Sequence, residues 1–374
     1  MEEIATLLEG FRGLPDLGLG PRSQTQIEEQ FTRPFLALHR TCDLYAARVA
    51  LILMLELGWE ARLRAGATLD ELIAGLAAQA RGPGSWMLTF LAEEGLLSKR
   101  GERYFLEGEA MVSLGELRAL AEEHYPGQGV NFDLFDAIHD RILPFFTEGR
   151  PAEPLLFDLA LMPLWLAYFA NDNRLYRPNN LLTVIALREG LPPGARILEV
   201  GSGSGSFARL LYQDAVEGGY LDRIAEYRFT DITPTFLRKA QRELPGALSG
   251  LPLRFSHLDL NRDLLAQGLT EGSFDAIVGV NVFHVAQDLQ ETLARVRRLL
   301  APGGRLILGE CLKPDLEHPI YLEFFFKFMK SFMEVNLDPE LRPVPGFLTP
   351  EIWQKALLAA GFTSVRSVPD TRAV

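Results

Sequence analysis

Cysteine is scarce in this sequence, and its histidines are dispersed. Among 374 residues there are two cysteines, Cys42 and Cys311, and no C-x-x-C pair. Two cysteines cannot build a disulfide framework, and such a low count is typical of proteins from a reducing cytoplasm. The six histidines lack the spacing of metal ligands. We therefore expect a cytoplasmic protein without a metal site.

A basic surface and long apolar runs are also missing. Acidic residues outnumber basic ones 49 to 37, which gives a formal net charge of −12. A surface this negative repels phosphate backbones, so we expect no nucleic-acid partner. The most apolar stretches, residues 49–55 and 159–170, are shorter than the ~20 residues of a membrane span. The acidic start at Met1-Glu2-Glu3 is unlike a secretory signal. We expect no membrane partner and no targeting segment.

The remaining composition, with 48% hydrophobic and 23% charged residues, is typical of globular proteins. The length predicts about two to three domains. We expect an N-terminal arm and a helical, winged-helix-like domain over residues 1–110, a helical linker or lid over residues 111–185, and a cofactor-binding domain over residues 186–374.

The N-terminal segment has the patterns of helices and one hairpin. Glycine and proline interrupt the first thirty residues, which predicts a loosely ordered arm. Helical periodicity follows over about residues 26–57, and Thr68 with Glu71 has the signature of a capping box. A further helix is expected over residues 85–94, and residues 95–106 predict two short strands around a polar turn. Helices followed by a hairpin outline a winged helix.

A winged helix suggests DNA binding, but the charges oppose that interpretation. The first 110 residues hold eleven basic and sixteen acidic residues. A recognition helix would lie at residues 85–94, which contain no lysine or arginine. Contacts to phosphate require cationic side chains. The sequence therefore favours a dimerisation or lid role for this region.

Beyond residue 192 short apolar runs alternate with helical segments. Before that point, helices are expected over residues 114–124, 132–146 and 155–170. The expected strands are residues 196–200, 227–230, 253–256, 274–280 and 305–309. Strands that alternate with helices form a parallel sheet through right-handed crossovers. We predict an α/β fold with a doubly wound, mostly parallel, Rossmann-like sheet, preceded by a mainly helical, winged-helix-like domain.

A glycine-rich turn follows the first expected strand directly. Gly201, Gly203 and Gly205 allow the backbone to turn tightly and to approach a ligand, and the next helix points its amide end at that ligand. Glu199 precedes the turn, and Ser206 stands where a dinucleotide-binding fingerprint has Gly or Ala. A carboxylate here repels a diphosphate and suits a cationic ligand, such as a sulfonium that carries an ammonium group.

Acids end the next two expected strands. Asp231 ends the second strand, where an acid accepts hydrogen bonds from ribose hydroxyls. Asp259 follows the third strand, where it can face an adenine amino group. Ligands of doubly wound sheets bind beyond the carboxyl ends of the strands. The two acids and the glycine turn therefore predict one nucleoside site.

The order of these motifs resembles class I S-adenosylmethionine-dependent methyltransferases. The resemblance covers about residues 190–310 and is carried by residues 197–207, Asp231, and residues 258–260, 272–278 and 299–306. A nearer similarity, to the C-methyltransferase domains of polyketide synthases, is carried by residues 229–234, 260–263, 267–268 and 281–284. The arm and the winged-helix-like region, residues 1–110, instead resemble the N-terminal half of small-molecule O-methyltransferases, which dimerise through that part, so the resemblance implies a homodimer.

The resemblance implies S-adenosyl-L-methionine as the cofactor and S-adenosyl-L-homocysteine as the product. It places Glu199 and the glycine turn along the amino-acid part of the cofactor and Asp231 at the ribose. It places Asp259 and Leu260 at the adenine, and Asn281 beside the methionyl portion. The candidate cofactor-binding residues are Glu199, Gly201, Ser202, Gly203, Gly205, Asp231, Ile232, Asp259, Leu260 and Asn281.

His284 and Glu310 are the candidate catalytic residues. His284 follows the fourth expected strand and Glu310 ends the fifth. Neighbouring strands lie roughly 4.8 Å apart, so the two side chains can meet at one rim of the sheet. Imidazole offers a neutral base near pH 7, and a carboxylate on its second nitrogen would fix the tautomer. The resemblance supports the pair, because polyketide C-methyltransferases have a His and a Glu at these motif positions.

Residues Phe325, Phe328, Met329 and Phe332 form an apolar stripe at helical spacing. The stripe is either part of a core or the cover of an apolar acceptor pocket.

The last residues predict an incomplete sheet. Class I sheets usually end in a helix and two antiparallel strands. Residues 349–360 predict the helix and residues 363–368 one strand, with no room for another before Val374. We expect the last strand to be missing or supplied elsewhere.

The expected activity is methyl transfer to a small, largely apolar metabolite or to a carrier-bound, polyketide-like acyl chain. The local motifs favour carbon over oxygen as the acceptor, and both stay open. One alternative is a non-catalytic S-adenosylmethionine-binding regulator with the winged-helix-like region as its output, which the acidic balance disfavours. Another is an NAD-dependent dehydrogenase, which Glu199 and the G-x-G-x-G spacing disfavour.

Overall fold

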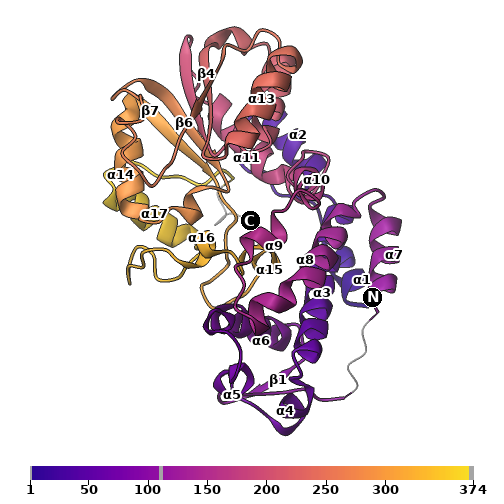
Figure 1. Ribbon diagram of the computed structural model, residues 1–374. Helices are drawn as coiled ribbons and strands as arrows, with labels where there is room; N and C mark the ends of the chain where they lie inside the picture. The colour runs from indigo at the N-terminus through magenta and orange to yellow at the C-terminus, as the bar shows by residue number, and fades with distance from the viewer. Residues whose placement is uncertain (1, 109–112, 370–374) are drawn as a thin grey trace. The chain divides into compact units, whose positions relative to one another are not determined.

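The computed structural model describes residues 2–108 and 113–369, and the chain divides into two compact units (Figure 1). The helical unit comprises residues 1–13, 31–168 and 313–333. The sheet unit comprises residues 14–30, 169–312 and 334–374. These units differ from the segments expected to end at residues 110 and 185, because residues 313–333 pack with N-terminal helices and residues 14–30 pack with the sheet.

The helical unit consists of twelve helical segments and one hairpin in the described part of the chain. They are α1 (Glu2–Gly10), α3 (Arg33–Glu56), α4 (Glu60–Ala65), α5 (Leu69–Ile73), η1 (Ala78–Ala80), α6 (Arg81–Glu93), β1 (Ser98–Arg100), β2 (Arg103–Phe105), α7 (Leu114–His124), α8 (Val130–Thr147), α9 (Glu153–Leu156), α10 (Met162–Tyr168), α15 (Glu323–Phe326) and α16 (Lys330–Met333).

The capping box and the hairpin that the sequence predicts are both present in this unit. Thr68 and Glu71 form both hydrogen bonds of a capping box at the start of α5, and β1 pairs with β2 as an antiparallel hairpin. The helix expected over residues 155–170 is wrong, because it is broken into α9 and α10. The break is local, since the Asp158 carboxylate accepts a hydrogen bond from Leu161 N (2.8 Å) and turns the chain.

The apolar stripe belongs to the core of the helical unit. Phe325 and Phe328 are buried. Phe325 packs on Phe135 with ring centroids 4.5 Å apart, and Phe328 packs edge-on to Phe145 at 5.5 Å. Pairs of this geometry stabilise a core beyond their buried area.

In its described residues, the sheet unit has five parallel strands in the order β5-β4-β3-β6-β7. The strands are β3 (Ala195–Val200), β4 (Ile224–Asp231), β5 (Leu253–His257), β6 (Phe274–Val280) and β7 (Leu300–Gly309). The helical segments are α2 (Pro21–Gln30), α11 (Arg177–Arg188), α12 (Ser206–Gly218), η2 (Leu221–Arg223), α13 (Pro234–Ala247), η3 (Phe283–Val285), α14 (Leu289–Leu299) and α17 (Pro350–Ala359). The predicted doubly wound, parallel α/β fold with a helical N-terminal region is confirmed.

Helices cover the sheet on both faces. Figure 1 shows α14 and α17 on one side of the strands and α11 and α13 on the other. Among these helices, α11 packs on β6 and β7, and α13 packs on β4 and β5. The strand order reverses between β3 and β6, so the carboxyl ends of these two strands form the topological switch point, where ligands of such sheets bind.

Two sequence expectations for the chain ends are wrong. The first thirty residues are not loosely ordered throughout, because α1 and α2 are helices. Their glycines and prolines lie mainly between the helices, and Pro21 stands at the start of α2, where its missing N–H costs nothing. Residues 363–368 form no strand. Val365 and Val368 are three positions apart, so an extended chain would turn them to opposite faces.

Candidate active site

The glycine turn after β3 is shaped by close contacts. Gly201 has a positive φ of 62°, and a Cβ at this position would lie 2.1 Å from Cγ2 of Val282. A larger residue would therefore displace the turn after β6. Ser202 binds the neighbouring strand, since its N donates to Thr230 O (2.9 Å) and its Oγ accepts from Thr230 N (3.1 Å).

Asp231 ties the glycine turn to the end of β4. Its Oδ2 accepts a hydrogen bond from Gly203 N (2.8 Å), and its Oδ1 accepts one from Thr233 N (2.6 Å). The side chain is buried, whereas its neighbour Ile232 exposes 53% of its surface. An acid anchored by two amides stands beside an exposed apolar side chain. Gly205, in the left-handed conformation, precedes the first residue of α12.

Glu199 lies at the end of β3 and is 2% exposed. Its Oε2 accepts a hydrogen bond from the Tyr227 hydroxyl (2.6 Å). Burial raises the pKa of Glu199 to about 8, although hydrogen bonds from Tyr227 and Ser202 oppose that change. A carboxyl group in this environment becomes ionised most easily when a cation binds beside it.

The turn after β5 carries Asp259 and Leu260. Asp259 N donates to Gln267 Oε1 (2.8 Å), and Gln267 Nε2 donates to Asp259 O (2.9 Å), so one amide side chain fixes the backbone on both sides. The Asp259 carboxylate accepts from Asn261 N (2.9 Å). Leu258 N donates to Asp231 O (3.1 Å), which holds this turn beside the end of β4.

Asn281 joins the ends of β6 and β7. Its φ of 52° is positive, which is rare for a residue with a side chain. Its N donates to Gly309 O (2.8 Å), and its Oδ1 accepts from Cys311 N (3.0 Å). Burial raises the pKa of the Cys311 thiol to about 12, so this thiol is not a nucleophile near neutral pH.

His284 and Glu310 meet as the sequence suggests. His284 Nδ1 lies 2.6 Å from Glu310 Oε2, and the two side chains are 5% and 3% exposed. Glu310 Oε1 also accepts hydrogen bonds from Val282 N (3.1 Å) and Phe283 N (2.7 Å). The carboxylate therefore holds both the imidazole and the backbone of η3, the turn that carries it.

Sequence reasoning missed a group of residues in the segment before β3. Asn180 Nδ2 donates to Ser206 Oγ (3.1 Å) and Asn171 Nδ2 donates to Ser206 O (2.7 Å), which supports the first residue of α12. Burial raises the pKa of the Tyr176 phenol above its usual range, and Asn281 hydrogen bonds to it. Four asparagines crowd residues 171–180, a density of polar groups that could have marked the segment. Arg342 and Phe347, which contact the His284 turn, were also missed.

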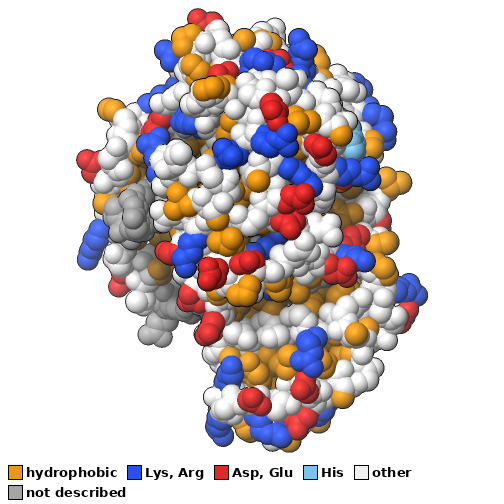
Figure 2. Space-filling view, turned by 90° about the vertical axis from the view of Figure 1, so that its left-hand side faces the viewer, with side chains coloured by type: hydrophobic (Ala, Val, Ile, Leu, Met, Phe, Trp, Pro, Cys, Tyr) orange, Lys and Arg blue, Asp and Glu red, His pale blue; other side chains and the backbone are white. Residues whose placement is uncertain are grey.

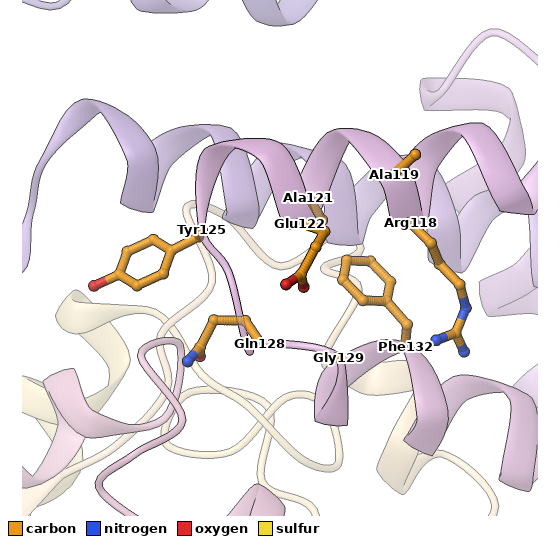
Figure 3. Close-up of a pocket in the computed structure, with 8 residues that line it drawn as sticks. All are labelled: Arg118, Ala119, Ala121, Glu122, Tyr125, Gln128, Gly129 and Phe132. Atoms are coloured by element: carbon orange, nitrogen blue, oxygen red, sulfur yellow. The ribbon is translucent and has the colours of Figure 1, made fainter.

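A pocket of about 280 Å³ lies in the helical unit and contains none of the candidate residues. Figure 3 shows Arg118 and Glu122 of α7 and Phe132 of α8 in its wall. Arg118 is already held by Asp133 (2.8 Å) and Asp136 (2.6 Å). The pocket thus offers no cationic group that lacks a partner.

On the face shown in Figure 2, lysine and arginine side chains alternate with aspartate and glutamate. Within residues 2–108 and 113–369, no helix combines the length and the apolar character that crossing a bilayer requires. The same residues contain no group of three or more His, Cys, Asp and Glu side chains arranged to hold a metal ion.

Comparisons with known proteins relate part of the chain to a family. Residues 198–306 match a family model described as a methyltransferase domain. Lovastatin diketide synthase lovF of Aspergillus terreus is 34% identical over 173 residues, which are 46% of this chain and 7% of that synthase. The chain therefore spans less than a tenth of the length of this relative.

Two solved structures share the fold. The CurJ carbon methyltransferase superposes with a TM-score of 0.72 at 23% identity and covers 97% of this chain and 91% of its own. The citrinin polyketide synthase CMeT domain superposes with a TM-score of 0.71 at 15% identity, with coverage of 94% and 92%. The chain thus contains a methyltransferase domain that has the fold of class I S-adenosylmethionine-dependent methyltransferases and is similar to the C-methyltransferase domains of polyketide synthases.

Proposed function

We propose that this chain transfers a methyl group from S-adenosylmethionine to a carbon atom of a polyketide-type acyl substrate, with His284 as the general base. The observation that carries the proposal is the 2.6 Å contact between His284 Nδ1 and Glu310 Oε2. Both side chains are buried beyond the carboxyl ends of β6 and β7, which is the edge where doubly wound sheets bind their ligands.

The cofactor, when bound, supplies a methyl group on a positively charged sulfur. The chain then has to align the acceptor carbon and remove its proton. With Nδ1–H donated to Glu310, the neutral imidazole of His284 carries its lone pair on Nε2. That nitrogen would take the proton from a carbon beside a carbonyl, and the electron pair left on that carbon would bond to the methyl group that the cofactor supplies as its sulfur leaves. Glu310 stabilises the imidazolium that forms.

The residues present fit this cofactor. The Glu199 carboxylate would accept hydrogen bonds from the ammonium group of the methionyl part. This cation would favour the ionised form of Glu199. The Asp231 carboxylate already accepts hydrogen bonds from Gly203 N and Thr233 N. Its remaining lone pairs would accept hydrogen bonds from the ribose hydroxyls. Ile232, which is half exposed, would flank the adenine. The other proposed contacts are Gly201, Ser202, Gly203 and Gly205 along the amino-acid part, Asp259 and Leu260 at the adenine, and Asn281 beside the methionyl portion.

The acyl substrate is proposed to be a thioester, carried by a protein or presented as a small molecule. The sequence similarity to polyketide synthases supports this class. The homodimer and the division into domains at residues 110 and 185 stay predictions.

Turnover of His284→Ala tests the function directly. The variant should lose about 10²–10⁴ in kcat on a β-ketoacyl thioester, because the base is removed, while its affinity for S-adenosylhomocysteine stays the same. His318→Ala is the matched control, because His318 Nδ1 also contacts a carboxylate, that of Glu93 (2.7 Å), within the helical unit. Isotope-labelled methyl groups, located by NMR in the product, separate transfer to carbon from transfer to oxygen.

Two results would overturn the proposal. One is His284→Ala with the turnover of the parent protein. The other is calorimetry in which NAD binds and S-adenosylhomocysteine does not, which would favour a dehydrogenase. A gel-shift assay at low salt tests the regulator alternative, and we expect no retardation of DNA.

A further inference from the structure

The turn that carries His284 is held at both ends. At its start, Glu310 Oε1 accepts the hydrogen bonds of Val282 N and Phe283 N. At its end, the guanidinium of Arg342 donates to His284 O (2.6 Å) and to Ala286 O. A short 3₁₀ turn leaves amides unpaired at one end and carbonyls unpaired at the other. An anion and a cation satisfy these groups on either side of the imidazole.

Arg342 has few other partners. It is 2% exposed, and burial lowers the pKa of its guanidinium to about 10, which nearby Asp288 and Glu310 partly oppose. Among residues 2–108 and 113–369, no carboxylate forms an ion pair with it, and its Nε has no hydrogen-bond partner. Burying an unpaired charge is unfavourable, so the two carbonyl oxygens of the His284 turn are the main compensation for this guanidinium.

The segment that presents Arg342 is fixed on the same turn. Arg342 N donates to Asp338 O (2.9 Å) and Asp338 N donates back to Arg342 O (3.0 Å). Asn336 N donates to Gln287 O (2.7 Å), just beyond η3. The ring of Phe347 packs on the imidazole of His284, with centroids 4.8 Å apart. Residues 336–347 therefore cover the His284 turn with one cation and one aromatic ring.

We propose that Arg342 is a positioning residue for His284: it holds the carbonyl end of η3 and places a buried positive charge beside the base. This inference rests on the proposed function. The groups that contact His284 or its turn include Glu310 from the end of β7 and Arg342 and Phe347 from residues 336–347. Asp288 lies near Arg342. Arg342 is the positively charged member of this set.

The test uses the full chain with Arg342→Gln, which removes the charge and keeps a donor. We expect kcat at pH 7 to fall about tenfold. The acidic limb of the pH–rate profile should move to higher pH by one unit or more, since one charge about 4 Å away at an effective dielectric of about 20 corresponds to about three units at most. Affinity for S-adenosylhomocysteine should change less than about twofold, because Arg342 does not contact the proposed cofactor residues.

Arg342→Lys separates charge from geometry. It keeps the cation, so the acidic limb should stay in place, but an ammonium group cannot bridge two carbonyls as a guanidinium does. We expect kcat to fall about threefold. Arg305→Gln is the matched control, because Arg305 also donates to two backbone carbonyls, Ala186 O (3.2 Å) and Leu187 O (2.8 Å), away from the His284 turn. Its pH profile should be that of the parent protein.

The outcomes are distinct. An acidic limb that does not move in Arg342→Gln, with kcat reduced equally at every pH, would show a purely structural role and overturn the inference. If Arg342→Gln does not fold, as judged by near-ultraviolet circular dichroism, Arg342→Lys decides, and parental turnover in that variant would overturn the inference. Failure of the proposed function appears separately, as full activity in His284→Ala.

Discussion

The proposed contact of Glu199 with the ammonium group of the cofactor predicts that cofactor binding depends on pH. Burial raises its pKa to about 8, so in the cofactor-free protein it is mostly protonated at pH 7. An ammonium group bound beside it favours the ionised form, and binding must release a proton at pH values below 8. Affinity for S-adenosylhomocysteine should therefore rise between pH 6 and pH 8, by up to about tenfold per unit. Calorimetry in buffers of different ionisation enthalpy measures both the affinity and the released proton.

Glu199→Gln provides the control. It keeps a hydrogen-bond acceptor for Tyr227 but cannot ionise, so its affinity should be weaker and independent of pH over the same range. Equal affinity of the parent protein at pH 6 and pH 8 would contradict the assignment. The contribution of Glu199 to folding stability changes with pH in the opposite direction to the cofactor affinity. The unfolded chain ionises this group near pH 4.3, so between pH 4.3 and 8 the folded state binds more protons, and stability falls as pH rises.

Site residues that end strands could be predicted from the sequence. Glu199, Asp231 and Glu310 stand at or just beyond the last residues of apolar runs, and parallel strands bring such positions to one edge. Arg342 could not be found in this way. Its contact with His284 O joins residues 58 positions apart, and residues 313–333 leave for the other unit in between. No local sequence pattern indicates that the segment with Arg342 packs on the turn that carries His284.

At the scale of elements, one buried acid contributes to the attachment of α2 to the rest of the sheet unit. Asp214 of α12 accepts hydrogen bonds from Arg22 (2.9 Å) and Gln26 (2.9 Å) of α2 and from Arg188 (2.7 Å) of α11. Burial opposes ionisation of Asp214, but hydrogen bonds from Gln26, Tyr220 and Arg188 hold its pKa below the usual range. One carboxylate therefore joins three helices.

Asp214→Ala should destabilise the protein by about 3 kcal/mol, because it leaves Arg188, whose side chain is 11% exposed, without its carboxylate. Urea unfolding measures this loss. Glu217→Ala on the same helix is the control, since Glu217 is 55% exposed and contacts Arg22 at 3.6 Å; such a pair contributes at most about 1 kcal/mol. Equal losses in the two variants would contradict the account. Because the pKa of Asp214 is lowered on folding, its contribution is present above about pH 3.9 and is lost as the pH falls.

The periodicity of apolar residues predicted the helices and strands that bury one continuous face. It failed where a single side chain interrupts an element. The five strands were predicted within a few residues, because buried parallel strands are apolar runs. The helix over residues 155–170 was not, because Asp158 captures a backbone amide and interrupts it. The arm was expected to be loose from its glycines and prolines, but Ile27 of α2 is buried and tertiary packing stabilises the helix.

At the scale of the whole molecule, the sheet unit depends on residues outside the segment that the sequence predicts as its domain. The fragment 186–374 lacks α2 and most of α11. It would lose the buried side chains of Ile27, Leu181, Val184 and Ile185. At about 1.5–3 kcal/mol each, their burial amounts to about 6–12 kcal/mol, which is comparable to the whole stability of a domain.

We therefore expect fragment 186–374 to show no cooperative urea unfolding and no binding of S-adenosylhomocysteine, whereas the full chain shows both. Near-ultraviolet circular dichroism and calorimetry make the comparison. A fragment that binds with the affinity of the full chain would support the division at residue 185 and contradict the dependence on α2 and α11.

Residues 313–333 belong to the helical unit, although the segments before and after them belong to the sheet unit. This order along the chain has a consequence for synthesis on the ribosome. A nascent chain that ends at Leu312 can complete neither core. In such a chain, Phe135 and Phe145 lack their ring contacts with Phe325 and Phe328. The sheet unit lacks α17 and the residues around Arg342. Such a chain exposes aromatic surface while it emerges and is prone to aggregate. Its yield in a heterologous host should therefore depend on chaperones that hold the growing polypeptide until translation has passed both segments.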